Sequence, residues 1–141
     1  MDILGLSFFY HDAAACLLRE GEVVAAAAEE RFSRKKHDFG FPRLAAEYCL
    51  REAGIGIEDV SHVGFYEKPI VKFDRILSSL LATAPRSYRA FLTAMPIWLR
   101  EKLWIRELIK RELGYQGEVL FGDHHHSHAA SAFYASPFEE A

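Results

Sequence analysis

The stretch Gly122–Tyr134, with the sequence GDHHHSHAASAFY, follows the short apolar run Val119-Leu120-Phe121. The apolar run predicts a short buried strand, and the alanines after the histidines favour a helix. Asp123 is placed to be the N-cap of this helix, because its carboxylate can accept hydrogen bonds from the free N–H groups of the first turn. α/β sheets usually present ligands at such a strand-to-helix junction, so the stretch is also the first candidate site.

Four of the seven histidines of the chain fall within five positions of this stretch. In a helix that begins after Asp123, His124 and His128 stand one turn apart on one face, and two imidazoles at this spacing can chelate a transition metal. A zinc-protease helix is excluded, because it needs a glutamate directly after its first histidine, where this chain has His125. Serine interrupts the run, which disfavours an expression tag. A solvated polar cluster that starts the helix without a metal stays open.

The composition fits one globular domain. With 141 residues, 50% of them apolar and 26% charged, the chain can bury a core of its own. The net charge of −3 gives no electrostatic reason to expect a nucleic-acid or membrane partner. Neither a signal peptide nor a membrane-spanning apolar stretch is visible. Cys16 and Cys49 lack a CxxC spacing, so we expect a cytoplasmic protein with two buried, reduced thiols.

Three strands are predicted ahead of the first helix, over Asp2–Phe8, Ala13–Leu18 and Val23–Ala28. The second and third are joined by a tight turn in which Gly21 can adopt a positive φ, so they form a hairpin and the three strands an antiparallel meander. By propensity alone, Ala25–Ala28 is also compatible with the start of a helix.

Charge is concentrated in Glu29–Asp38, directly after the third predicted strand. Arg34, Lys35, Lys36 and His37 are placed to gather around a phosphate or carboxylate group, which guanidinium and ammonium groups bind well. A solvated charged loop without a ligand is the alternative.

The rest of the chain alternates helix and strand. A helix is predicted over Pro42–Ala53, with Gly54 as its C-cap, and a fourth strand over Ser61–Tyr66. A strand, a helix and a strand in succession favour parallel pairing. A mainly helical insertion then covers about residues 68–113. Its predicted helices, punctuated by prolines, are Val71–Ala82, Ser87–Ala94 and Ile97–Leu113.

This order of predicted elements resembles half of a domain of the actin/hexokinase/Hsp70 superfamily. Three motifs narrow the resemblance: FYHDAA at Phe9–Ala14, EERFSRKKH at Glu29–His37 and DHHHSHAASAF at Asp123–Phe133. Together they resemble the N-terminal region of the NodU/CmcH-type O-carbamoyltransferases over essentially the whole chain. The fold class implied is α/β and RNase-H-like, a mixed five-stranded sheet with helices on both faces and the helical insertion.

The resemblance implies a two-step enzyme. In that family a YrdC-like domain makes carbamoyl-adenylate from carbamoyl phosphate and ATP, and the superfamily domain transfers the carbamoyl group to a hydroxyl of a small-molecule acceptor. A divalent metal, iron in family members, is held by the two histidines of His-x-x-x-His and a later aspartate. His124 and His128 match this pair.

The resemblance also suggests where the base for the attacking hydroxyl lies. His11 and Asp12 match the family's loop that faces the transfer site, and either could take the proton. Capping of the hairpin is the other role open to them. Some family members carry an aspartate where this chain has Phe9, so no base role transfers to that position.

Family enzymes are several times longer than this chain. We therefore expect residues 1–141 to be the N-terminal half of the transferase domain, excised or truncated, and to need the remaining domains for activity. Carbamoyltransferases that make threonylcarbamoyl-adenosine in tRNA or mature hydrogenases share His-x-x-x-His and form one alternative, although the Glu29–His37 motif favours the small-molecule branch. A non-catalytic metal- or nucleotide-binding subunit is the other.

Overall fold

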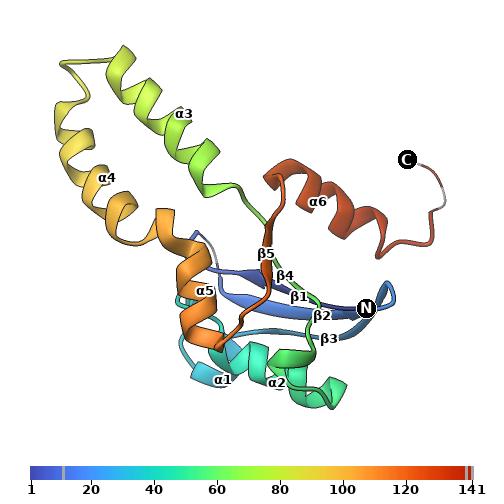
Figure 1. Cartoon of the computed structure of the whole chain (residues 1–141). Helices are drawn as coiled ribbons and strands as arrows, with labels where there is room; N and C mark the ends of the chain where they lie inside the picture. Colours follow the sequence, from blue (N-terminus) through green and yellow to red (C-terminus); the bar gives the residue numbers. More distant parts are fainter. Residues whose placement is uncertain (11, 139, 141) are drawn as a thin grey trace.

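A five-stranded mixed sheet lies at the centre of the computed structural model, which describes residues 1–10, 12–138 and 140 (Figure 1). Its strands are β1 (Asp2–Ser7), β2 (Ala14–Arg19), β3 (Glu22–Ala28), β4 (His62–Phe65) and β5 (Glu118–Phe121). They lie in the order β3-β2-β1-β4-β5. β2 is antiparallel to β1 and β3, whereas β4 is parallel to β1 and β5. The predicted meander, parallel crossover and RNase-H-like half-domain are therefore confirmed.

The first face of the sheet is covered by α2 (Arg43–Ala53), which packs against β2 and β3. Successive side chains of a strand point to opposite faces, so every second strand residue enters this core. The fully or nearly fully buried strand residues include Leu4, Leu6, Leu17, Val63 and Phe65, and α2 adds Ala45, Ala46 and Cys49. Gly54 ends α2 with a φ of 67°, which confirms the predicted C-cap.

The second face is flanked by α6 (His124–Phe133), which follows β5 (Figure 1). α6 stands off the sheet beyond its first turn. A hollow of about 840 Å³ separates the two, lined by small residues of the strands, such as Gly5, Cys16 and Gly64, and by Ser127 and Ser131 of α6.

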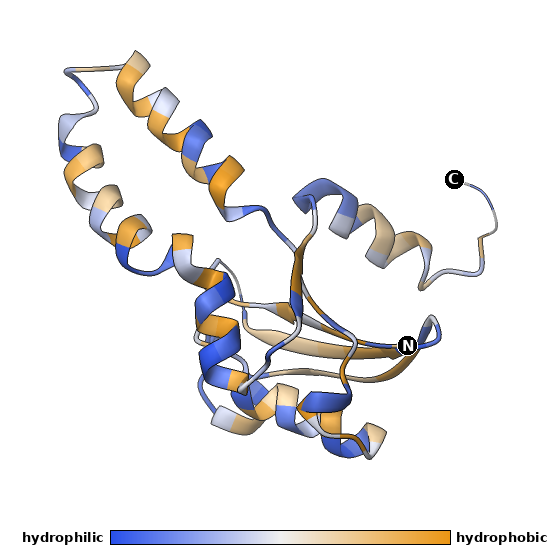
Figure 2. Ribbon diagram, in the orientation of Figure 1, coloured by the Kyte–Doolittle hydropathy of each residue, from blue (hydrophilic) through white to orange (hydrophobic). Residues whose placement is uncertain are grey.

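Three helices connect β4 to β5: α3 (Pro69–Ala82), α4 (Tyr88–Arg100) and α5 (Ile105–Leu113). α3 and α4 project from the sheet as a hairpin along which apolar residues recur (Figure 2). None of the helices in the described part of the chain is long and apolar enough to span a bilayer.

The prediction that Pro96 separates two helices is wrong, because Pro96 lies inside α4. A proline removes one helical hydrogen bond, but Met95 and Trp98 on either side of it are buried. The Trp98 ring lies 5.7 Å from the ring of Phe73 in α3, so packing between the two helices holds the segment helical. The break falls instead at a short 3₁₀ turn, Lys102–Trp104.

Candidate active site

The strand ends bring the predicted site segments to one edge of the sheet. Ala14 pairs with both Ser7 and Ala28, so β1 ends, β2 begins and β3 ends at the same level. Phe65 pairs with Phe121 at the ends of β4 and β5. The loop after β1, the charged segment after β3, the segment after β4 and the histidine helix all leave from this carboxyl edge, where open α/β sheets bind ligands (Figure 1).

The histidine helix α6 begins where the sequence predicts. Asp123 is its N-cap, and the carboxylate accepts a hydrogen bond from the backbone N–H of His125 at 3.2 Å. Desolvation opposes ionisation of Asp123, but hydrogen bonds from the backbone of His125 and His126 outweigh it and lower the pKa of this carboxyl. The Ser127 hydroxyl lies 2.9 Å from the Asp123 carbonyl and 3.1 Å from that of Tyr66, so it links the first turn of α6 to the end of β4.

His124 and His128 lie on one face of α6, with ring centroids 4.6 Å apart. Nδ1 of His124 is buried and has no hydrogen-bond partner, although buried polar atoms normally have one. Both observations fit a metal ion between the two imidazoles. Among the described residues no group of three or more His, Cys, Asp and Glu side chains is placed to hold a metal. Such a pair would supply two of the four ligands that a zinc-like ion takes.

Asp12 and His37, predicted in two different roles, meet at the same edge. Oδ1 of Asp12 lies 3.2 Å from Nδ1 of His37, and both side chains are more than half exposed. Backbone bonds fix the two loops to each other, because the N–H of Ala13 donates to the carbonyl of Asp38 at 2.7 Å. His11, the other predicted catalytic residue, lies outside the described residues.

The basic side chains Arg34, Lys35 and Lys36 are exposed at the far end of this edge. The charged segment, expected to be a loop, begins instead with one helical turn, α1 (Glu30–Ser33). None of the three side chains forms an ion pair with another described residue, so they are free to bind an anion. β3 and β5 are the two edge strands of the sheet, so the charged segment and the histidine helix leave it from opposite sides.

Glu29, at the start of the charged segment, is buried rather than solvated. It is 5% exposed, and its carboxylate accepts hydrogen bonds from the backbone N–H groups of Leu44 at 3.1 Å and Ala45 at 2.8 Å. These N–H groups belong to the first turn of α2, where a negative charge is favourable. Glu29 therefore attaches the charged segment to the core.

The middle of the edge holds a charged cluster to which the sequence analysis assigned no role. Glu67, two residues after β4, is 6% exposed and forms an ion pair with Lys72 of α3 at 2.7 Å. The ammonium groups of Lys72 and Lys102 lie 3.9 Å and 4.3 Å from the ring centroid of Tyr10. The sequence signal for this cluster was a glutamate close to the end of an apolar strand. Its partner Lys72 lies in the helical insertion, and the sequence gives no reason to pair the two.

Tyr66 forms an aromatic wall beside the histidine pair. Its ring centroid lies 5.7 Å from that of His124 and 6.4 Å from that of Tyr10. The hydroxyl groups of both tyrosines are buried without a hydrogen-bond partner. Burial and the nearby Glu67 carboxylate raise the pKa of Tyr66 to about 12, so the phenol stays protonated at neutral pH and can donate a hydrogen bond.

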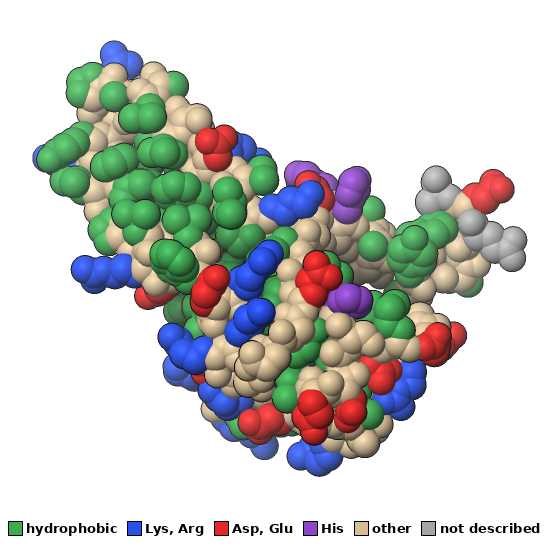
Figure 3. Space-filling model, in the orientation of Figure 1, with side chains coloured by type: hydrophobic (Ala, Val, Ile, Leu, Met, Phe, Trp, Pro, Cys, Tyr) green, Lys and Arg blue, Asp and Glu red, His purple; other side chains and the backbone are tan. Residues whose placement is uncertain are grey.

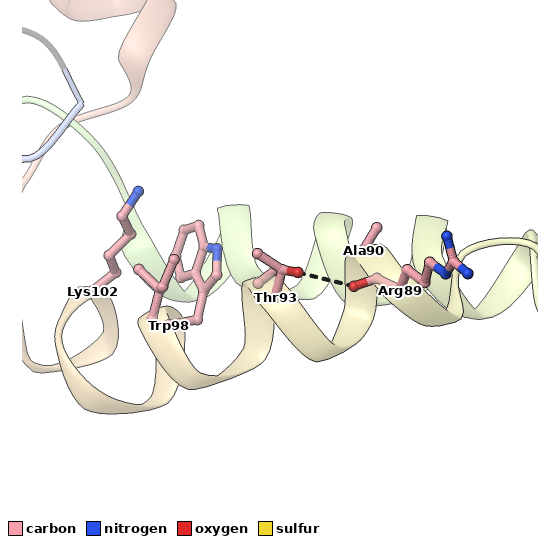
Figure 4. Close-up of a pocket in the computed structure, with 7 residues that line it drawn as sticks. Arg89, Ala90, Thr93, Trp98 and Lys102 are labelled. Carbon is pink, nitrogen blue, oxygen red and sulfur yellow. Dashed lines mark hydrogen bonds between the residues drawn. The ribbon is translucent and has the colours of Figure 1, made fainter.

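A second hollow, of about 510 Å³, runs along α4 and is lined by Arg89, Thr93, Trp98 and Lys102 among others (Figure 4). The hydroxyl of Thr93 donates to the carbonyl of Arg89 at 3.0 Å, which is a contact within the helix. The Lys102 ammonium lies 5.4 Å from the Trp98 ring. None of the predicted site residues lines this hollow, so the carboxyl edge of the sheet is the candidate active site.

The chain is similar to known proteins over nearly its whole length. Residues 2–141 match the family model described as "Carbamoyltransferase N-terminus". An uncharacterised protein of Synechocystis, sll1178, is 51% identical over 99% of this chain, and the nodulation protein NolNO of Sinorhizobium fredii is 37% identical over 94%. The chain spans 24% and 19% of the lengths of these two relatives.

The chain thus has a half-domain sheet and, at the carboxyl edge of that sheet, a helix with paired histidines. It also matches one family over nearly its whole length. The chain belongs to the carbamoyltransferase family and corresponds to its N-terminal region.

Proposed function

We propose that the chain forms part of the catalytic domain of an O-carbamoyltransferase. In the proposed reaction carbamoyl phosphate, water and ATP yield carbamoyl-adenylate, phosphate and pyrophosphate. The carbamoyl group of the adenylate then passes to a hydroxyl of a small-molecule acceptor. The observation that carries the proposal is the presence of Asp12 and the His124–His128 pair at one sheet edge of a family member. Similarity to a nodulation protein over most of the chain supports the small-molecule branch over the tRNA and hydrogenase branches.

Asp12 is the proposed base for the transfer step. Its exposed carboxylate accepts the proton of the acceptor hydroxyl, the hydroxyl oxygen bonds to the carbonyl carbon, and the bond from that carbon to the phosphate oxygen breaks to release AMP. The imidazole of His37, 3.2 Å away, orients the carboxylate. His11 is the alternative base suggested by the sequence.

His124 and His128 would hold a divalent metal ion, iron by analogy with the family. When bound, such an ion polarises a phosphoryl or carbonyl oxygen. Tyr66 and Ser127 keep the first turn of α6 in place beside β4. The exposed cations Arg34, Lys35 and Lys36, with His37, would bind a phosphate of ATP or of carbamoyl phosphate.

The test uses the complete protein that contains this chain, with isotope-labelled carbamoyl phosphate, ATP, ferrous iron and a panel of hydroxyl acceptors. We expect release of pyrophosphate from ATP that depends on carbamoyl phosphate, and label in one acceptor. Asp12→Asn should slow label transfer but leave the release of pyrophosphate. Pyrophosphate release that does not require carbamoyl phosphate would contradict the proposal. The absence of any release would also contradict it and would favour a non-catalytic nucleotide- or metal-binding subunit.

A further inference from the structure

A small pocket lies where the base of α3 meets the first turn of α6. Its volume is about 330 Å³. It is lined by Glu67, Lys68, Val71, Lys72 and Arg75 on one side and by Asp123, His124 and His125 on the other. Figure 3 shows cationic, acidic and histidine side chains side by side where the hairpin meets α6. Lys72 and Arg75 are three residues apart in α3, so their side chains share one face of the helix, and Lys68 is the N-cap residue just ahead of it.

The charges of this pocket are only partly balanced. Lys72 is paired with the buried Glu67 and also lies over the ring of Tyr10, so its position is fixed by the protein. The Asp123 carboxylate is engaged by the backbone of α6. Lys68 and Arg75 are exposed, and neither forms an ion pair with another residue in the part of the chain that the structure describes. Three cations thus face two carboxylates, and two of the cations are free.

The ligand that this arrangement suits is a phosphate group. The planar guanidinium of Arg75 can donate two parallel hydrogen bonds to phosphate oxygens, and Lys68 adds a second positive charge. The pocket volume is at the small end of the range for ligand sites, which fits one or two phosphate groups rather than a whole nucleotide. The basic residues Arg34–His37 follow β3, at the other edge of the sheet from β5, and none of them lines this pocket.

We propose that Lys68 and Arg75 form a phosphate-binding subsite beside His124, separate from the basic residues 34–37. Lys72 and Glu67 are its positioning residues, because their ion pair holds the base of α3 against the sheet edge. Only the identity of the phosphate donor, ATP or carbamoyl phosphate, depends on the function proposed above. Binding of the anion itself does not.

The test follows pyrophosphate binding to the complete protein, with a chelator present to remove metal, by hydrogen–deuterium exchange. We expect pyrophosphate to slow exchange in the peptides that cover residues 67–76 and 122–128. Arg75→Ala should raise the pyrophosphate concentration that gives half of this protection at least tenfold. Arg75→Lys should raise it less. Arg89→Ala, on the exposed hairpin, is the matched control and should bind as the wild type does.

Equal protection in Arg75→Ala and Arg89→Ala, or protection confined to residues 29–40, would overturn the proposal. The experiments can refute the proposed function and the proposed phosphate subsite independently of each other. Slower exchange in these peptides without carbamoyl transfer would support the phosphate subsite and contradict the proposed function. Carbamoyl transfer that Arg75→Ala does not impair, without local protection, would refute the subsite and leave the function.

Discussion

The Asp12 carboxylate and the His37 imidazole lie 3.2 Å apart, although 25 positions separate them in the sequence. The sequence assigned them to different tasks, one to catalysis and the other to phosphate binding. The backbone bond between Ala13 and Asp38 places them together, because it joins the loop after β1 to the end of the charged segment. The proposed base, Asp12, therefore has beside it a group that can orient its carboxylate.

Asp12→Asn should slow carbamoyl transfer by about 10²- to 10⁴-fold, because the amide cannot accept the hydroxyl proton. The side chain is 53% exposed, so the free energy of unfolding should change by less than about 0.5 kcal/mol. Single-turnover transfer from carbamoyl-adenylate and urea unfolding measure the two effects. His37→Gln should slow transfer less than Asp12→Asn does. Equal transfer rates in wild type and Asp12→Asn would exclude Asp12 as the base.

Arg34→Ala and Lys36→Ala should each raise the KM for ATP or carbamoyl phosphate about tenfold, which corresponds to the loss of about 1.4 kcal/mol of binding free energy. Both side chains are exposed, so the melting temperature should stay unchanged. Steady-state kinetics and thermal unfolding of the complete protein test this, with Arg86→Ala on the exposed hairpin as control. Unchanged kinetics with a lowered melting temperature would show that Arg34 and Lys36 stabilise the fold and do not bind the phosphate.

The sheet and the start of the histidine helix could be predicted because local physics decides them. The run Val119–Phe121 is apolar, and Gly54 can take the positive φ that ends α2. Asp123 has the side chain that a helix N-terminus needs, and this fixes the register that places His124 and His128 on one face. In each case the residue determines the conformation of the strand or helix end in which it lies.

The parts that could not be predicted depend on residues far apart in the sequence. Pro96 usually ends a helix, but burial of Trp98 against Phe73 of α3 keeps α4 continuous. The charge of Glu67 suggests solvent, yet its partner Lys72 and the shared contact with Tyr10 become visible only in the fold. Tertiary packing overrides local propensity in both cases.

Glu29→Ala should lower the free energy of unfolding by about 2–3 kcal/mol, because two buried backbone N–H groups lose a charged acceptor. Glu29→Gln should cost less, since its amide oxygen can still accept one of the two bonds. Urea unfolding measures both changes. The control Glu22→Ala removes an exposed carboxylate on β3 and should alter stability by less than about 0.5 kcal/mol. Equal stability of Glu29→Ala and Glu22→Ala would show that the two hydrogen bonds to Glu29 do not stabilise the fold.

Cys49 should resist alkylation in the native protein at pH 8. Burial raises the pKa of this thiol to about 11, and the thiolate is the reactive form, so only about one thiol in a thousand is reactive at pH 8. The side chain is also fully buried. The rate should rise with pH toward 11 and should rise sharply in urea. Mass spectrometry after iodoacetamide treatment measures it. Equal labelling of native and unfolded protein would show that Cys49 is accessible.

His124→Ala and His128→Ala should each remove bound metal from the complete protein, whereas His125→Ala and His126→Ala should retain it. The reason is geometric: successive helix residues rotate by about 100°, so His124 and His128 share a face, and their rings lie 4.6 Å apart. Metal content and titration measure the effect in each variant.

His125→Ala is the decisive control for this register, because the His124 and His125 rings are 5.5 Å apart and His125 lies three positions from His128. Loss of metal in His125→Ala as complete as in His124→Ala, or retention in His128→Ala, would show that other histidines are the ligands. In the wild type, metal binding should weaken as the pH falls, because protons compete with the metal for the imidazole nitrogens. This chain alone, with two ligands, should bind metal more weakly than the complete protein does.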